Sequence, residues 1–387
     1  MKSKLMKSEL MQPRILKSIA SNRTRGFSMV ELMVAMSVGL VIMGGAMELF
    51  KSATSATMMV TQQAEMQQNV RAALNLVARD VSMAGSGLPS GGLALPYGVG
   101  AVASFYGCSQ TPPCYLTTDK YPSGTVGGAT VSNYMYGLIP GPLNGMESGG
   151  AATIAATKVA ADSITVVYED YSFPLSQFTI VLDPSNTFVT ATAPATPPAG
   201  FPGIVSPTGI ALGDLIMLTN NTGTAVGEVT GVTAAGLGGT INFANSDALK
   251  INQTGATSGN IGTSLAAGGP IQANRIFVVS YFVEVPTTAG SKPRLMRQVN
   301  GQTAVPVADN IIGLSFTYDM CDSVTNTTTC ANISDPIGNN PSFSPNQIHK
   351  VNIQMMGQSV LSTSNQSRSM ALATSVSTRN LSYVNRY

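Results

Sequence analysis

One glutamate stands inside a long apolar stretch near the start of the chain. The sequence RTRGFSMVELMVAM, which begins at Arg23, places Glu31 five residues into a run that otherwise has the composition of a membrane helix. A carboxylate in a hydrocarbon layer costs about 2–3 kcal/mol even on lenient insertion scales, so an acid at such a position is expected to have a function. The chemistry that suits Glu31 is the pairing of its charge with a cation.

A source of that cation lies just before Glu31, at the junction of Gly26 and Phe27. Gly26 gives a peptidase an unhindered, flexible backbone next to a helix start, and Arg23 and Arg25 hold the junction at the cytoplasmic membrane surface. Cleavage after Gly26 would leave a free α-amino group on Phe27. Glu31 lies one turn further on, where the helix dipole favours an acid. It could neutralise this amino group or, more strongly, that of a neighbouring subunit.

The 24 residues from Phe27 to Phe50 form the membrane-length part of the expected helix. As a helix they measure about 36 Å, which is enough to span a bilayer. A secretory signal would have a shorter apolar core followed by a cleavage site, whereas here the helical pattern continues beyond Phe50, which favours a membrane anchor. The many Lys and Arg side chains of residues 1–26 place the N-terminus in the cytoplasm and the residues from 51 onward outside.

The same helix is expected to continue beyond the membrane. No proline occurs between Pro13 and Pro89, and apolar residues recur along one helical face; these are Met59, Met66, Val70, Leu74, Val77 and Val81. We predict one helix over residues 28–84, with Gly85 as its C-cap. Its second half, residues 51–84, is amphipathic and must pack on the rest of the chain.

The remaining residues, 85–387, have the pattern of a β-rich head. Short β-branched runs alternate with Gly, Pro, Asn and Ser clusters. The predicted strands cover residues 163–168, 178–182, 214–218, 225–232, 275–285, 295–299, 311–318, 349–356 and 370–379. Residues 84–150 and 192–209 predict long loops rich in Gly and Pro. The expected fold class is therefore α+β, a long N-terminal helix packed on a largely antiparallel β-sheet head.

The charge pattern suits an extracellular protein. Only 10% of the residues are charged, against about 25% in an ordinary soluble domain. No Lys or Arg cluster follows Arg25, so nucleic acid is not an expected partner.

The four cysteines form two local pairs, Cys108 with Cys114 and Cys321 with Cys330. Neither pair has the spacing of a redox or zinc motif. We expect two local disulfides, which require an oxidising compartment. Four free thiols are the alternative.

The sequence offers no set of residues for catalysis. The single histidine, His349, opens a predicted strand without Cys, Asp or Glu at metal-ligand spacing, and we expect a structural or surface role for it. No nucleophile elbow, P-loop or paired acidic motif is evident. We therefore expect neither an enzyme nor a bound cofactor or metal ion.

The stretch GFSMVELMVAM, which begins at Gly26, resembles the class III signal of type IV pilins. In that family a basic leader ends in Gly and is followed by Phe, Thr or Ser, two apolar residues, Glu and Leu. The resemblance implies that a prepilin peptidase removes residues 1–26, cuts between Gly26 and Phe27, and N-methylates Phe27. It also implies that Glu31 helps to recruit the subunit into the filament.

Two further stretches resemble PilW-like minor pilins: NVRAALNLVARDVSMAG, residues 69–85, and SMALATSVSTRNL, residues 369–381. For the first, the alternative is a plain amphipathic helix with solvated Arg71, Arg79 and Asp80. Many major pilins have a proline where this chain has Glu48, and that departure fits a minor subunit.

The resemblance implies a minor pilin that takes part in assembly initiation or in the tip complex of a type IV pilus. Its partners would be the prepilin peptidase, other minor pilins, the major pilin and the inner-membrane assembly platform. Before assembly it would cross the inner membrane once with its N-terminus in the cytoplasm, and afterwards it would be part of the extracellular pilus. A type II secretion pseudopilin and a pilus-tip adhesin are the alternatives.

Overall fold

The computed structural model describes residues 26–89, 91–102, 104, 106, 124–126, 129–131, 134–141, 146–148, 161–205, 209–265, 270–285, 292–320, 331–334, 345–359 and 368–381. The basic leader before Gly26 and all four cysteines, with the two expected disulfides, lie outside these residues. The chain divides into two compact units, Met1–Met59 and Val60–Tyr387.

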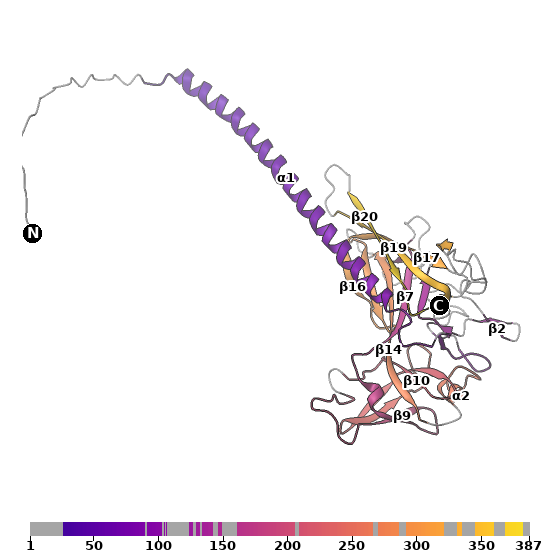
Figure 1. Cartoon of the computed structure of the whole chain (residues 1–387). Helices are drawn as coiled ribbons and strands as arrows, with labels where there is room; N and C mark the ends of the chain where they lie inside the picture. Colours follow the sequence, from indigo (N-terminus) through magenta and orange to yellow (C-terminus); the bar gives the residue numbers. More distant parts are fainter. Residues whose placement is uncertain are drawn as a thin grey trace, which may run out of the picture. The chain divides into compact units, whose positions relative to one another are not determined.

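A single helix, α1 (Met29–Ser82), covers 54 residues and confirms the helix predicted over residues 28–84 (Figure 1). It ends shortly before Gly85, which has a left-handed φ of 75° that glycine adopts without steric cost. The amide of Gly85 donates to the carbonyl of Val167. This bond ties the end of the helix to strand β7 (Ser163–Glu169).

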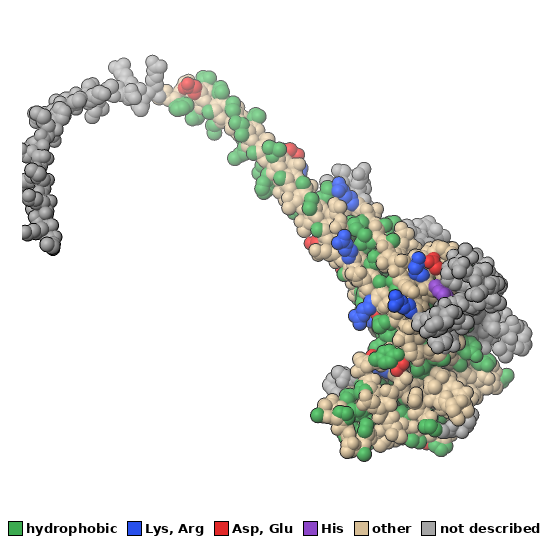
Figure 2. All heavy atoms as spheres, in the orientation of Figure 1, with side chains coloured by type: hydrophobic (Ala, Val, Ile, Leu, Met, Phe, Trp, Pro, Cys, Tyr) green, Lys and Arg blue, Asp and Glu red, His purple; other side chains and the backbone are tan. Residues whose placement is uncertain are grey.

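The first half of α1 presents apolar side chains on all sides. Every residue from Gly26 to Ala53 is exposed, and Figure 2 shows hydrophobic side chains along this part of the helix. By length and composition α1 could cross a membrane. So much exposed apolar surface requires lipid or other protein to cover it.

The head is built around β14 (Gln272–Val285). This strand pairs antiparallel with β7, β10 (Leu215–Thr219) and β15 (Arg294–Val299), and parallel with β6 (Met146–Ser148). Together they belong to an eight-stranded sheet, whose further members are β5 (Leu138–Gly141), β11 (Thr224–Glu228) and β16 (Val305–Asp309).

Two four-stranded antiparallel sheets accompany it. One has the order β18-β17-β19-β20 and consists of β17 (Ile311–Met320), β18 (Ala331–Ile333), β19 (Ile348–Gln358) and β20 (Ser369–Ser377). The other has the order β12-β13-β9-β8 and consists of β8 (Thr179–Leu182), β9 (Phe188–Thr192), β12 (Gly231–Ala235) and β13 (Gly238–Asn242). The short elements are β1 (Leu93–Ala94), β2 (Gly124–Val126), β3 (Ala129–Val131), β4 (Tyr134–Met135), α2 (Ile261–Ser264), η1 (Leu175–Gln177) and η2 (Pro345–Gln347). A long N-terminal helix followed by antiparallel sheets confirms the α+β fold class.

The head has separate apolar cores at the two ends of β14. Figure 1 shows β9, β10 and α2 at one end and β17 and β19 at the other. The core beside α1 joins the helix to β7, β15, β17 and β19. At the other end, β8, β9, β13 and α2 enclose a core of their own. Because these elements fall between β7 and β14 in the sequence, residues 171–271 form an inserted lobe.

The second half of α1 packs through the face predicted from its periodicity. Of the predicted residues, Met59 is half-buried and the others are buried: Met66, Val70, Leu74, Val77 and Val81. A Cβ atom on Gly357 of β19 would lie 2.6 Å from Val70 Cγ2. Glycine at this position therefore lets the helix approach the sheet closely.

One predicted strand, residues 225–232, is wrong. β11 ends at Glu228, and β12 begins at Gly231 in a different sheet. Between them the amide of Val229 donates to Asp214 and that of Thr230 to Asn242, so the backbone changes partner within two residues. The other eight predicted strands are confirmed within three residues. The strands β9, β13, β16 and β18 and the short strands of residues 84–150 are additional to the prediction.

Asp80, in the last turn of α1, is buried and joins the helix to the sheet. Its Oδ2 atom accepts a hydrogen bond of 2.6 Å from the hydroxyl of Tyr281. The same oxygen accepts bonds from Arg297, at 3.2 Å from Nε and 3.1 Å from Nη2. The interpretation of Asp80 as a solvated residue is therefore wrong, although Arg71 and Arg79 are exposed as expected.

The tyrosines around Asp80 remain protonated at neutral pH. Burial, followed by the negative charge of Asp80, raises the pKa of Tyr168 to about 12. The same two causes raise the pKa of Tyr281. Tyr281 is therefore a permanent donor to Asp80.

Replacing Asp80 tests this attachment. Asp80→Ala leaves the half-buried Arg297 without its carboxylate, and we expect the free energy of unfolding to fall by about 3 kcal/mol. Denaturant unfolding of the full chain in detergent measures the change. The exposed neighbour Arg79 provides the matched control, since Arg79→Ala should change stability by less than about 0.5 kcal/mol. Equal effects of the two substitutions would contradict the anchoring role of Asp80.

Candidate functional site

The first turn of α1 holds Glu31 in a reciprocal cap. The backbone amide of Ser28 donates to Glu31 Oε2 at 3.1 Å, and the amide of Val30 donates to Ser28 Oγ at 3.3 Å. This arrangement is a capping box, in which two side chains satisfy backbone amides that have no partner within the helix.

The capping box gives Glu31 a role that the sequence analysis missed. The signal was present as Ser28-Met29-Val30-Glu31, the serine-x-x-acid pattern of a helix start. Glu31 is exposed, so its carboxylate can exchange the Ser28 amide for another donor at little cost. The cap orients the carboxylate of Glu31, and its exposure leaves it accessible to another donor.

The junction between Gly26 and Phe27 is open to another molecule. The side chain of Phe27 is 81% exposed, and a Cβ atom added to Gly26 would meet nothing within 4 Å. The junction lies immediately before the cap at Ser28. Gly26, Phe27 and Glu31 thus lie together within one short, exposed segment.

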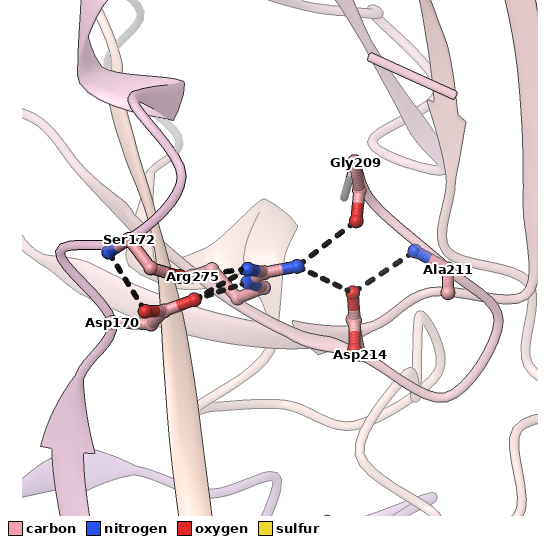
Figure 3. A network of polar contacts seen from close by, with 6 residues as sticks. All are labelled: Asp170, Ser172, Gly209, Ala211, Asp214 and Arg275. Carbon is pink, nitrogen blue, oxygen red and sulfur yellow. Dashed lines mark hydrogen bonds and ion pairs between the residues drawn. The ribbon is translucent and has the colours of Figure 1, made fainter. Parts of the chain in front are cut away.

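Arg275 on β14 is the centre of a polar cluster that connects neighbouring segments of the head (Figure 3). Arg275 Nε donates to Asp170 Oδ2 at 2.6 Å, and Nη1 donates to the carbonyl of Gly209 at 2.9 Å. Nη1 also lies 3.5 Å from Asp214 Oδ2. Asp170 follows β7 and Asp214 precedes β10, so this cluster fastens the inserted lobe to β14. The N–H groups of Arg275 donate to acceptors of the protein itself, which indicates a structural role.

A second acidic cluster lies within the inserted lobe. Glu228 and Asp247 are both buried; Glu228 Oε2 accepts from the amide of Leu249 at 2.7 Å, and Asp247 Oδ2 accepts from the amide of Ile251 at 2.5 Å. Burial, together with the neighbouring charge of Asp247, raises the pKa of Glu228. Burial beside this charge therefore favours the protonated form of Glu228 in the folded chain.

The described residues contain no group of three or more His, Cys, Asp or Glu side chains that could hold a metal ion. His349 is half-buried, and burial lowers its pKa. Its Nε2 atom has no hydrogen-bond partner within the described part of the chain. A neutral, structural His349 agrees with this environment.

Comparison with protein families finds the prokaryotic N-terminal methylation motif over residues 21–47. The match contains Gly26, Phe27, the cap and the apolar half of α1. It supports a pilin-type subunit with a class III prepilin signal, and it fits a membrane-anchored pilin before assembly.

Two other comparisons add little. A type IV-like pilin from Thermus thermophilus matches 44% of this chain and 87% of its own chain, with 9% sequence identity and a TM-score of 0.16. A TM-score of this size supports neither the fold nor the function. No curated protein matches the chain.

The acidic pair predicts a pH dependence of stability. Because the pKa of Glu228 is raised, the folded chain binds this proton more tightly than the unfolded chain. The stabilisation is complete below the unfolded pKa of about 4.3 and is lost as the pH rises through the folded pKa. Asp247→Asn removes the neighbouring negative charge, which is one cause of the raised pKa of Glu228. The stability of this variant should therefore fall less than that of the wild type as the pH rises above about 4.3.

Thermal unfolding of the full chain in detergent measures this difference, which we expect to be about 2 °C. Asp309→Asn is the control, since Asp309 is an exposed carboxylate outside the pair. Identical pH slopes for the wild type and both variants would show that the charge of Asp247 does not raise the pKa of Glu228.

Proposed function

We propose that this chain is a minor pilin of a bacterial type IV pilus that takes part in assembly initiation or in the tip complex. The observation that carries the proposal is the methylation motif over residues 21–47, at the start of a helix whose first half is fully exposed and apolar. The proposed role is structural rather than enzymatic.

Processing takes place at the accessible junction. A prepilin peptidase removes residues 1–26 and N-methylates Phe27, whose exposed position suits both steps. The chain begins in the inner membrane with its N-terminus in the cytoplasm, because the leader is cationic. The assembly platform then moves it into the extracellular pilus with other minor pilins and the major pilin.

Assembly exchanges one apolar environment for another. In the membrane, lipid covers the exposed face of residues 27–50. In a filament, neighbouring helices cover it instead, so the subunit leaves the bilayer without exposing this surface to water. The first half of α1 needs no packing within its own chain for this reason.

Glu31 changes partner during assembly. Before assembly its carboxylate accepts from the Ser28 amide. In the filament it pairs with the α-amino group of Phe27 of a neighbouring subunit, which is a stronger, charge-assisted partner. A neutral backbone donor is thus replaced by a cation.

The inserted lobe favours a second candidate, a pilus-tip adhesin. Residues 171–271 have an apolar core of their own, which the attachment of α1 does not require. A glycan or surface-binding assay on the assembled pilus tests this possibility. A type II secretion pseudopilin would share the leader and α1, and its co-purifying partner subunits distinguish it from a type IV pilus component.

Mass spectrometry of sheared surface filaments tests the proposed function. The mature chain should begin at Phe27, carry one additional methyl group and be present in the filament fraction. In a peptidase-deficient strain it should remain full-length and in the membrane. An increase in the mass of the mature chain by two hydrogen atoms per disulfide on reduction would support the proposed pairs Cys108–Cys114 and Cys321–Cys330. Recovery of an uncut chain from filaments, or of a soluble chain cut after residue 50, would refute the proposal.

Substitution of Glu31 separates capping from assembly. Glu31→Gln keeps an acceptor for the Ser28 amide, because glutamine also forms capping boxes, but it removes the charge. We expect normal membrane insertion and removal of the leader, with a loss of at least about tenfold in the filament fraction. Glu31→Ala removes both functions, and Glu48→Gln is a control for charge in the same half of α1. Normal incorporation of Glu31→Gln would exclude the charge-pairing role.

A further inference from the structure

β20 forms an edge of the sheet that contains β17 and β19 (Figure 1). It pairs with β19 over nine residues without a register shift, from Lys350 opposite Ser377 to Gln358 opposite Ser369. Among the described residues, β19 is its one strand neighbour. Within the described part of the chain, its second side is therefore an unpaired edge of this sheet.

The register shows which backbone groups lie along that edge. The amide of Thr378 donates to the carbonyl of His349, and the amide of Ser359 donates to the carbonyl of Arg368. Both bonds join residues that are directly opposite each other, and such pairs alternate along an antiparallel ladder. The even-numbered residues of β20 therefore bond to β19. The odd-numbered residues direct their amides and carbonyls away from it: Ser369, Ala371, Ala373, Ser375 and Ser377.

These outward groups have no backbone partner among the described residues. The side chains of the same five residues are exposed. β20 also lacks the features that usually protect an edge from pairing, since its sequence SMALATSVS contains no charge, proline or glycine and its ladder has no bulge. Nine residues of strand measure about 30 Å, which is long for an unprotected edge.

The inner face of β20 is incompletely covered. Met370, Leu372 and Val376 pack against the core beside α1 but remain partly exposed, whereas Val351, Ile353 and Met355 of neighbouring β19 are buried. A further strand would continue this apolar row. The outer face bears small and polar side chains. Among them, Ser315, Thr317, Asn352, Gln354, Ala373 and Ser375 line a hollow of about 430 Å³.

We propose that β20 is a docking edge that pairs with an extended, uncharged strand of a neighbouring pilin subunit. This proposal rests on the assembly role proposed above. The partner strand has apolar side chains at alternate positions, which continue the row of Met370, Leu372 and Val376. Its other side chains are small and polar, to match the outer face.

The partner strand is not a second β20. Two copies joined through the same antiparallel edge would be related by a two-fold axis, and the α1 segments that pack beside their sheets would run in opposite directions. Subunits anchored in one membrane share one direction. The strand therefore comes from a different edge of the neighbouring subunit.

The double variant Ala371→Pro with Ala373→Pro tests the edge. Proline removes two outward amides and leaves the bonds of the even-numbered residues to β19 in place. We expect unchanged processing at Phe27, a similar thermal midpoint and a loss of about tenfold or more from the filament fraction. The matched control, Ala371→Ser with Ala373→Ser, keeps both amides and should assemble like the wild type.

Hydrogen exchange supplies the second readout. The amides of Ala371, Ala373 and Ser375 should exchange rapidly in the full chain in detergent and slowly in filaments. Protection already present in the isolated chain, or normal incorporation of the proline variant, would overturn the docking edge. Absence of the wild-type chain from filaments would instead refute the proposed function, so the two failures are distinct.

Discussion

The contact of Asp80 with Arg297 and Tyr281 is the constraint on which the attachment of the helix depends. A carboxylate 2% exposed is tolerated only where it is paired and hydrogen-bonded, and here a cation and a phenol meet the same oxygen. Arg297 and Tyr281 lie on adjacent strands, opposite each other in the ladder of β14 and β15. The helix end is therefore fixed to one position on the sheet, because any slip would leave the buried Asp80 and Tyr281 and the half-buried Arg297 without these partners.

The apolar contacts of α1 act together with this polar contact. Val70, Val77 and Val81 are buried, but apolar contacts alone specify a position along the helix only loosely. The directional bonds of Asp80 fix that position, and Gly357 allows the close approach that results. Gly85 then ends the helix where its amide meets Val167. The fixed attachment lies wholly within the second half of α1, so the first half remains free for lipid or for neighbouring subunits.

The sequence predicted those helices and strands that have a regular pattern of apolar residues or end at a local signal such as glycine. The helix followed from its apolar repeat and from Gly85, and most strands followed from β-branched runs. Changes of partner were not predictable: Glu228 and Gly231 lie in one apolar run but belong to different sheets, and only tertiary contacts decide this. The local sequence around Asp80 indicated a solvated residue. Its burial could not be predicted, because it depends on a contact with Arg297, 217 residues away in the sequence. The cap at Ser28 and Glu31 was local and could have been predicted from its spacing.

The two acids at the ends of α1 differ in the cost of losing their partners. Asp80 is buried, so removing Arg297 would leave an uncompensated charge with no access to water. Glu31 is exposed, so water can replace the Ser28 amide during any exchange of partners. One carboxylate is thus suited to a permanent attachment and the other to a replaceable one. In the proposed assembly the helix keeps its attachment to the head while its other end moves from lipid to a protein neighbour, and the different burial of the two acids suits these two demands.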